Sequence, residues 1–227
     1  VVIIGTGAGG AAAALELASQ GLAVVVLEEG RYHDRRDFTG RLTEMVPKLY
    51  RAMGLTAAIG NTVIPVPIGR NVGGTTTINS GTAMAAPPAT LARWRASGLR
   101  DFTDTEMAPY NAEVMDILQV QKADPRYVGE IGKVMREGAN RIGFVQTHDL
   151  PRNATGCDGQ GLCQFGCPTD AKQSTNVSYM PRALDAGAFL FTGFKATELL
   201  KQGHIIEGVR AEGRTRDGKP RTLTVRA

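Results

Sequence analysis

The hydrophobic pattern of the first thirty residues predicts a compact βαβ unit. Val1–Ile4 is a continuous apolar run, as expected of a parallel strand that is buried on both faces. Residues 11–19 are rich in Ala and Leu, which favour a helix, and Gly21 is suited to end it. Val24–Leu27 is a second apolar run. The unit therefore predicts two parallel strands joined by a right-handed helical crossover.

The rest of the chain has a helical pattern in its middle and a strand-like pattern at its end. Helices are expected at residues 42–53, 88–97, 105–119, 128–143 and 179–186. Residues 62–68 are rich in β-formers, but two prolines there favour an edge strand or an extended loop. Alternating apolar positions with Gly-containing turns predict a β-meander over residues 189–192, 196–200, 205–210 and 223–225. The predicted fold class is α/β.

Composition excludes several classes of protein. Of the 227 residues, 42% are hydrophobic and 21% charged, which is ordinary globular usage and argues against disorder. A formal charge of +4 and 6% aromatic residues give no sign of a nucleic-acid-binding surface. No apolar run reaches the roughly 18 residues of a membrane span. Both ends fall in strand-like sequence and the first residue is not Met, so a fragment of a longer protein is expected.

Glycine is over-represented, and its positions suggest a phosphate-binding turn. There are 28 glycines, about 12% against a typical value of about 7%, and they cluster at residues 5–10, 69–74 and 156–166. Gly5–Gly10 fits G-x-G-x-x-G directly after the first strand and at the start of the helix. In this motif the glycines allow a sharp turn, a close approach of backbone to pyrophosphate, and tight packing of helix on strand.

Glu28 supplies the acid that such a unit needs. It lies 18 positions after Gly10, at the end of the second strand, where a carboxylate accepts hydrogen bonds from ribose hydroxyls. An acid here disfavours a 2′-phosphate and therefore NADP. The alternative is a plain Gly-rich turn with Glu28 solvated. This motif does not separate FAD from NAD.

A second cluster, Gly69–Ser80, is too rich in Gly and Thr to be core. Its paired glycines allow main-chain N–H groups to approach a flat or anionic ligand, and its threonines and Asn79 add hydroxyl and amide groups. It predicts a ligand loop, with an irregular structural loop as the alternative. The polar stretch 172–176, after the third glycine cluster, is interpreted as a simple connection.

Together these segments resemble the glucose-methanol-choline (GMC) oxidoreductases, in their N-terminal FAD-binding part. The family pattern is G-x-G-x-x-G, then V-L-E-x-G, then G-R-x-x-G-G-[ST]-[ST]-x-x-N, then a Trp. The matching segments are Gly5–Gly10, Leu27–Gly30, Gly69–Asn79 and Trp94. Residues 186–209 look like the family's return to the FAD domain, so the resemblance covers essentially the whole chain.

The resemblance implies a flavoprotein that oxidises the CH–OH group of a sugar, sterol or long-chain alcohol by hydride transfer to FAD. By this resemblance, the first motif would bind the pyrophosphate and Glu28 the adenosine ribose. Residues 73–75 and Asn79 would contact the flavin, and the main chain near residue 196 would contact the adenine. The implied cofactor-binding residues are Gly5, Gly7, Ala8, Gly9, Gly10, Glu28, Gly69, Arg70, Gly73, Gly74, Thr75, Asn79 and Ala196.

No catalytic base is assigned. The family's catalytic His belongs to a C-terminal part that this chain lacks, and His33, His148 and His204 are interpreted as solvated or structural. Residues 75–80 contain no His or Cys, which gives no support to covalent flavin attachment. The expected domains are a Rossmann-like FAD-binding domain, with parallel sheet and β-meander, from 1–90 and 183–227. A mostly helical cap region, 91–182, is expected as an insertion.

The inserted region carries a cysteine loop, 156–168. Cys157, Cys163 and Cys167 lie within eleven residues among glycines, and three thiolates suit a [3Fe–4S] cluster. The spacing resembles the loop of bacterial FAD-dependent sugar dehydrogenases, in which a cluster passes electrons to a cytochrome-type partner, and also that of long-chain alcohol oxidases. The alternatives are zinc completed by Asp158 or His148, one disulfide, or three buried thiols.

Two other functions compete with an FAD-dependent alcohol dehydrogenase. An NAD-dependent Rossmann dehydrogenase would leave the second glycine cluster and the cysteine loop unexplained. A non-catalytic nucleotide-binding or electron-relay module is compatible with the missing base.

Overall fold

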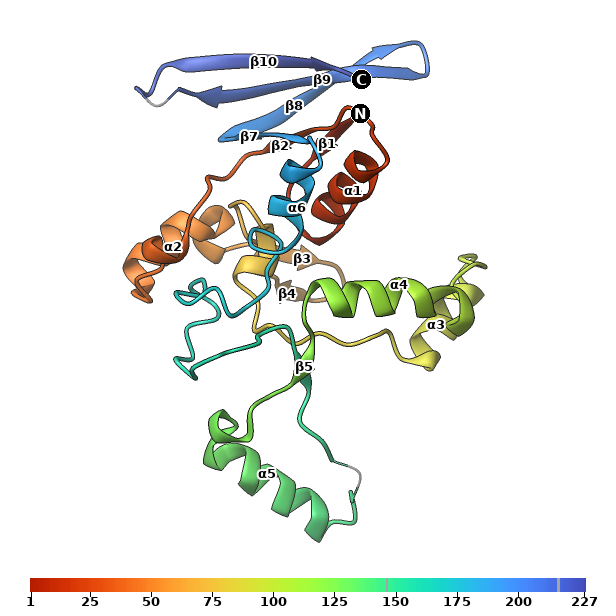
Figure 1. The fold of residues 1–227 in the computed structure, drawn as a ribbon, viewed down its shortest axis with the longest axis vertical. Coiled ribbons are helices and arrows are strands. Elements are labelled where there is room, and N and C mark those ends of the chain that lie inside the picture. Colours follow the sequence, from red (N-terminus) through yellow and green to blue (C-terminus); the bar gives the residue numbers. More distant parts are fainter. Residues whose placement is uncertain (146, 216) are drawn as a thin grey trace. The chain divides into compact units, whose positions relative to one another are not determined.

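The fold comes from a computed structural model that describes residues 1–145, 147–215 and 217–227. The chain divides into two compact units. The first unit comprises residues 1–80, 162–170 and 174–227, and the second comprises 81–161 and 171–173. Each is described by itself, with the element labels of Figure 1.

A three-stranded parallel sheet forms the base of the first unit, in the order β1 (Val2–Ile4), β2 (Val25–Glu28), β7 (Phe189–Thr192). Helix α1 (Ala8–Ser19) connects the first two strands, as predicted. The sequence placed residues 189–192 in the β-meander, and this was wrong. Helix α6 (Tyr179–Asp185) precedes β7 and supplies the crossover that lets it lie parallel to β2.

The β-meander itself consists of three antiparallel strands, β8 (Phe194–Gln202), β9 (Ile205–Arg214) and β10 (Pro220–Arg226), in the order β10-β9-β8. It is the blue ribbon beside β1 and β2 in Figure 1. Val209 and Ala211 of β9 form a buried cluster with Leu27 of β2. The predicted combination of parallel sheet and β-meander is therefore confirmed.

Burial within the parallel sheet differs from the expectation for its first strand. In β2, Val26 and Leu27 are buried, whereas Ile4 at the end of β1 is 54% exposed. The reason is that β1 is an edge strand of this sheet. Helix α1 buries a stripe of small side chains, Ala11, Ala14 and Ala18, and packs on α6. Methyl side chains allow the two helices to come close together.

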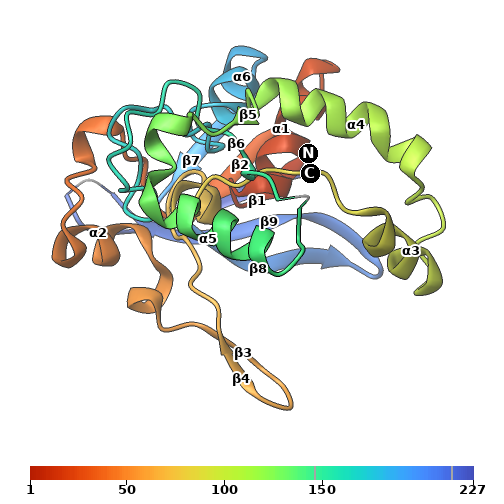
Figure 2. The same ribbon diagram turned by 90° about the horizontal axis from the view of Figure 1, so that it is seen from below.

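The long connection from β2 to the second glycine cluster is folded into short elements. They are η1 (Arg35–Asp37), α2 (Leu42–Leu49), η2 (Arg51–Gly54), β3 (Ala57–Ile59), β4 (Val63–Pro65) and η3 (Gly74–Thr77). The helix predicted over 42–53 is interrupted at Tyr50, whose backbone is extended. Strands β3 and β4 form a two-stranded hairpin (Figure 2), so residues 63–65 are a strand that pairs on one side. Phe38, Met45, Leu49 and Ile78 form a small core.

The second unit is mainly helical, as predicted. Its elements are α3 (Pro88–Ala96), α4 (Asp104–Ile117), β5 (Gln121–Lys122), η4 (Pro125–Tyr127), α5 (Gly129–Arg141) and β6 (Pro151–Arg152). Thr103 is the N-cap of α4, and its Oγ1 accepts a hydrogen bond from Glu106 N and donates one to the Glu106 carboxylate. Among the described residues, no helix has the length and apolar character needed to cross a bilayer. The predicted domain boundaries, 1–90 with 183–227 and 91–182, stay a prediction.

Candidate functional site

The turn between β1 and α1 is closed tightly on itself. Gly5 has φ +93°, in the left-handed region that favours glycine, and its N–H donates to Leu27 O at 2.8 Å. A Cβ on Gly10 would lie 2.1 Å from Gly5 O and 3.4 Å from Cγ2 of Ile3. A Cβ on Gly7, in contrast, would meet nothing within 4 Å. The turn thus has a packed side at Gly10 and an open side at Gly7.

The start of α1 at this turn is suited to an anion. Its N-cap is Gly7, which provides no side-chain cap, and the first turn contains no acidic residue. The N–H groups of the first helical turn have no intrahelical acceptor, and the helix dipole favours negative charge there. A phosphate group would complete this helix end.

Thr6 and Glu28 join the turn to the end of β2. Glu28 is 5% exposed and Thr6 is fully buried. Glu28 Oε2 accepts hydrogen bonds from Thr6 N at 3.0 Å and from Thr6 Oγ1 at 2.7 Å, and Oε1 accepts one from Gly30 N at 2.8 Å. A carboxylate has about four acceptor positions, so three are in use and capacity remains for a ligand hydroxyl.

The second glycine cluster lies directly against this turn. Gly73 N donates to Thr6 Oγ1 at 2.9 Å. A Cβ on Gly74 would be 3.2 Å from Gly7 Cα, and both Gly73 and Gly74 have positive φ. Gly69 belongs to the same arrangement, because its N–H donates to Thr75 Oγ1 at 3.1 Å. The structure thus brings together the two glycine-rich segments that the sequence singled out.

The other sequence-predicted residues are more peripheral. Arg70 is exposed and its N–H donates to Leu49 O at 2.7 Å. Asn79 is also exposed, at the end of the loop, with its N–H donating to Thr75 O. Ala196 is half-buried on β8, where it pairs with Ala211.

Three buried polar residues near the turn were missed by the sequence reasoning. Thr6 stands at a variable position of the motif, and Thr175 lies in the stretch that was interpreted as a simple connection. Asn71 is 1% exposed, donates through Nδ2 to Leu49 O at 3.0 Å, and leaves its Oδ1 buried without a hydrogen-bond partner. The only sequence signal was the unusual density of Thr and Asn in these segments.

A cavity of about 1120 Å³ lies within the first unit. The loop after β2 contributes Glu29–Arg31 to its wall, and the ends of β8, β9 and β10 contribute the opposite side. Most of the charges in its lining are cationic: Arg31, Lys48, Arg70, Lys195, Arg214 and Arg221. Glu29 and Glu212 are the acidic groups of this lining. The balance favours an anionic or nucleotide-like ligand.

Comparison with known proteins decides the family. The sequence matches the family described as GMC oxidoreductase over residues 46–226, and an FAD binding domain over residues 1–34. The chain belongs to the GMC oxidoreductase family. A GMC-type oxidoreductase of Mycobacterium tuberculosis that is described as uncharacterized is 38% identical over 216 residues, which are 92% of this chain and 34% of that protein. A long-chain-alcohol oxidase of Arabidopsis thaliana is 32% identical over 196 residues, 86% of this chain and 26% of that protein.

Solved structures agree on the fold of this GMC chain. An FAD-dependent oxidoreductase from Chaetomium thermophilum has a TM-score of 0.70 at 17% identity. The superposed region covers 100% of this chain and 43% of the oxidoreductase chain. Pyridoxine 4-oxidase from Mesorbium loti has a TM-score of 0.64 at 16% identity, and the superposed region covers 98% of this chain and 47% of the oxidase chain. The GMC chain thus spans about a third or less of the length of its curated relatives, and less than half of these structures.

The cysteine loop of this GMC chain is anchored to the small core around α2. A Cβ on Gly166, which has φ +89°, would lie 2.2 Å from Cδ1 of Phe38. Phe165 packs against the same core, and Tyr50 OH donates to Gln164 O at 2.8 Å. The segment 162–170 therefore belongs to the first unit, whereas 156–161 belongs to the second.

The structure gives no support to the predicted [3Fe–4S] cluster. Cys157, Cys163 and Cys167 are half-buried thiols that no disulfide joins. Within the part of the chain that the structure describes, no three His, Cys, Asp or Glu side chains gather into a group that could hold a metal. The three cysteines are divided between the two units, with Cys157 in the second and both Cys163 and Cys167 in the first.

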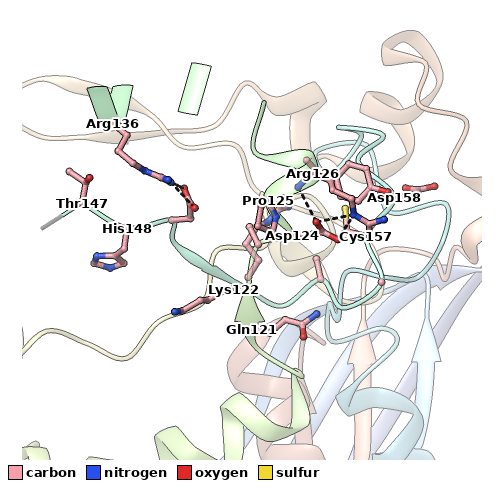
Figure 3. A pocket seen from close by; sticks show the side chains of 16 residues that line it. Gln121, Lys122, Asp124, Pro125, Arg126, Arg136, Thr147, His148, Cys157 and Asp158 are labelled. Atoms are coloured by element: carbon pink, nitrogen blue, oxygen red, sulfur yellow. Dashed lines mark hydrogen bonds and ion pairs between the residues drawn. The ribbon is translucent and has the colours of Figure 1, made fainter. Parts of the chain in front are cut away.

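A second cavity, of about 790 Å³, lies within the helical unit and is drawn in Figure 3. Its charged side chains are largely paired with one another. Arg136 Nη2 is 2.8 Å from Asp149 Oδ1, and Arg126 Nη2 is 2.6 Å from Asp124 Oδ2. Cys157 also lines it and accepts a weak hydrogen bond from Gly159 N at 3.4 Å. Such paired, exposed charges give this cavity little net charge for a ligand.

His33, which lines the cationic cavity, should make the stability of this GMC chain pH-dependent. Burial lowers the pKa of His33 below 6.5, against the opposing effect of Asp37. The folded state therefore binds a proton less readily than the unfolded state, so the free energy of unfolding falls as the pH drops below about 6.5. Lys48 and Arg31 also disfavour the protonated form.

Urea unfolding between pH 7 and pH 5 tests this expectation, since most carboxylates stay ionised in that range. His33→Gln should reduce the loss of stability across the interval. An unchanged slope in the variant would show that other groups cause the dependence.

Proposed function

We propose that this chain is the FAD-binding part of an enzyme that oxidises the CH–OH group of an alcohol by hydride transfer to flavin. The observation that carries the proposal is the meeting of the two glycine clusters, with Gly74 against Gly7 and Gly73 N on Thr6 Oγ1. This contact supports a single binding surface formed by a pyrophosphate-type turn and a second ligand loop. Bound FAD would supply the acceptor for the hydride.

The residues present fit a dinucleotide. The open side of the turn at Gly7 and the uncapped start of α1 would hold the pyrophosphate, with Gly5, Ala8, Gly9 and Gly10 shaping the backbone. The remaining acceptor capacity of Glu28 would bind the adenosine ribose. The cationic cavity beside the loop after β2 would take the adenosine end, with the main chain at Ala196 nearby.

The flavin end is assigned to the second cluster. Gly73, Gly74 and Thr75 would approach the ring system with their backbone, and the exposed Asn79 would lie beside it. Gly69 and Arg70 would shape the start of this loop. The catalytic base is assigned to protein beyond this chain. We treat the three cysteines as thiols, because the described residues contain no group of three His, Cys, Asp or Glu side chains that could hold a metal.

The substrate proposed for the first test is a long-chain alcohol. The plant relatives at 27–32% identity are named long-chain-alcohol oxidases. Sugars and sterols are the other alcohol classes to compare. The same assay distinguishes between the two electron acceptors, oxygen and a cytochrome-type protein.

Cofactor release followed by turnover tests the proposal. In the full-length protein that contains this chain, acid extraction should release FAD, and addition of the right alcohol without oxygen should bleach the flavin band near its visible maximum. Oxygen would then restore the band in an oxidase, whereas only an added cytochrome or dye would do so in a dehydrogenase. Released nicotinamide would establish the Rossmann dehydrogenase instead, and bound FAD without bleaching by any alcohol would favour a binding or relay module.

Glu28→Gln should weaken FAD binding and also reduce stability. The amide keeps one acceptor oxygen, so its NH₂ group faces either the two Thr6 donors or the Gly30 N–H and cannot accept a hydrogen bond from them. An unsatisfied buried group costs about 1–3 kcal/mol. Equilibrium dialysis against FAD and urea unfolding of the apoprotein measure the two effects.

Glu16→Gln provides the matched control, since Glu16 is exposed on the outside of α1 and bonds only to Gln20 in the hydrogen bonds described for it. Full flavin occupancy in Glu28→Gln after dialysis would contradict the ribose role.

A further inference from the structure

Thr175 lies at the point where three distant parts of the first unit meet. Its Oγ1 donates to Thr6 O at 2.8 Å, which links it to the turn after β1. Its N–H donates to Thr76 Oγ1 at 3.0 Å, which links it to the second glycine cluster. One residue thus bonds to segments that precede it by 169 and 99 positions.

Each hydroxyl of this network lies close to a carbonyl acceptor. Thr76 Oγ1 donates to Gly73 O at 2.6 Å. Thr175 Oγ1, which donates to Thr6 O, also lies 3.0 Å from Thr76 Oγ1 and 3.4 Å from Gly73 O. Because Gly73 N donates to Thr6 Oγ1, the bonds close into a ring through both glycine clusters. Thr6 Oγ1 also donates to Glu28, which attaches the ring to the end of β2.

Burial makes these bonds consequential. Thr6 is 0% exposed and Thr175 is 3% exposed, so water cannot replace a lost partner. The position of Thr175 is itself fixed, because Ser174 Oγ donates to Asn176 Oδ1 at 2.6 Å and α6, which follows, packs on α1. The segment before α6 is therefore a rigid support for the turn.

The Thr175–Thr6 bond also controls a phosphate-binding group. Thr6 C=O and Gly7 N–H belong to one planar trans peptide, in which the two bonds point in opposite directions. Holding Thr6 O toward Thr175 therefore directs the Gly7 N–H away from it. Gly7 N–H is one of the groups with which a turn of this type approaches pyrophosphate.

We infer that Thr175 is a positioning residue for the cofactor: it sets the orientation of the Thr6–Gly7 peptide and locks the pyrophosphate turn to the flavin loop. The inference rests on the proposed FAD function. It predicts that the Thr175 hydroxyl affects the affinity for FAD more than it affects the stability of the empty fold.

The test compares Thr175→Val, which keeps the shape without the hydroxyl, with Thr175→Ser, which keeps the hydroxyl. Titration of each apoprotein with FAD, followed by flavin fluorescence, gives Kd, and urea unfolding gives stability. We expect Kd to rise about tenfold or more in the Val variant, because the Gly7 N–H is no longer held toward the pyrophosphate, and to stay within about twofold in the Ser variant. Thr155→Val is the control, since its Oγ1 donates to Gln119 O at 2.9 Å within the second unit.

The outcomes separate the inference from the proposed function. A wild-type protein that binds no FAD overturns both. A wild-type protein that binds FAD, with an unchanged Kd in Thr175→Val or an equally weak Thr175→Ser, overturns the positioning role alone. Should Thr175→Val fail to fold, Thr76→Val removes the other end of the network, and a normal FAD affinity in that folded variant overturns the inference.

Discussion

Gly10→Ala should prevent the first unit from folding stably, with or without cofactor. The added methyl carbon would lie 2.1 Å from Gly5 O, a backbone atom, and 3.4 Å from the side chain of Ile3. Neither β1 nor α1 can retreat without opening the packing of α1 on α6. Overpacking of this kind costs typically 1–3 kcal/mol and more where backbone must move, so we expect about 3 kcal/mol or more. Urea unfolding of the apoprotein, monitored by circular dichroism, measures the loss.

Gly9→Ala is the matched control, one position earlier in the same helix. A Cβ on Gly9 would meet nothing within 4 Å, and alanine favours a helix by roughly 0.5–1 kcal/mol over glycine. The Gly9 variant should therefore equal or exceed the wild type in stability without cofactor. Equal unfolding midpoints for the Gly10 variant and the wild type would show that helix and strand do not pack as closely as described.

The elements that sequence predicts well are those with a local cause. The β1-α1-β2 unit follows from two apolar runs around an alanine-rich helix. The structure has both strands within one residue of the expected ends, whereas α1 begins three residues before the expected start. The same holds for α3, α4, α5 and α6, whose composition and boundaries are set by nearby residues. The family can also be predicted from sequence, because each of the two glycine motifs is contained in a short stretch of the chain.

Sheet membership could not be predicted in the same way. Phe189–Thr192 has the same alternation as the meander strands that follow it, yet it pairs with β2, which lies 164 residues earlier. A period of two identifies a strand and leaves open which partner it has. The decision comes from α6, because a helix before the strand brings it back parallel to the sheet, and this is a property of the connection.

The polar ring around Thr6 also leaves no periodic signal. Thr6 occupies a position that the motif leaves variable, and Thr175 follows the cysteine loop in a stretch of ordinary polar residues. Their contact arises only when α6 packs on α1 and draws residues 174–176 over the turn. The three cysteines are neighbours in sequence, yet one belongs to the second unit and two belong to the first, so their spacing alone does not establish a common site.

Gly7→Val should abolish FAD binding and leave the empty fold intact. Gly7 has φ −65° and ψ −172°, which a valine can adopt, and a Cβ there would meet nothing within 4 Å. Its side chain would instead occupy the open side of the turn, where we propose that the pyrophosphate lies. We expect a rise in Kd on the order of 100-fold, equivalent to about 2.7 kcal/mol, with the urea midpoint of the apoprotein close to that of the wild type.

Gly138→Val makes the same change in the second unit, at a helix position whose Cβ would also meet nothing within 4 Å. It should bind FAD as the wild type does. The contrast with Gly10→Ala is what makes the pair informative: a clash with protein backbone removes both fold and cofactor, whereas a clash with ligand removes the cofactor alone. A Gly7→Val protein that retains full flavin would mean that the pyrophosphate does not pass this side of the turn, however well the remaining motif matches.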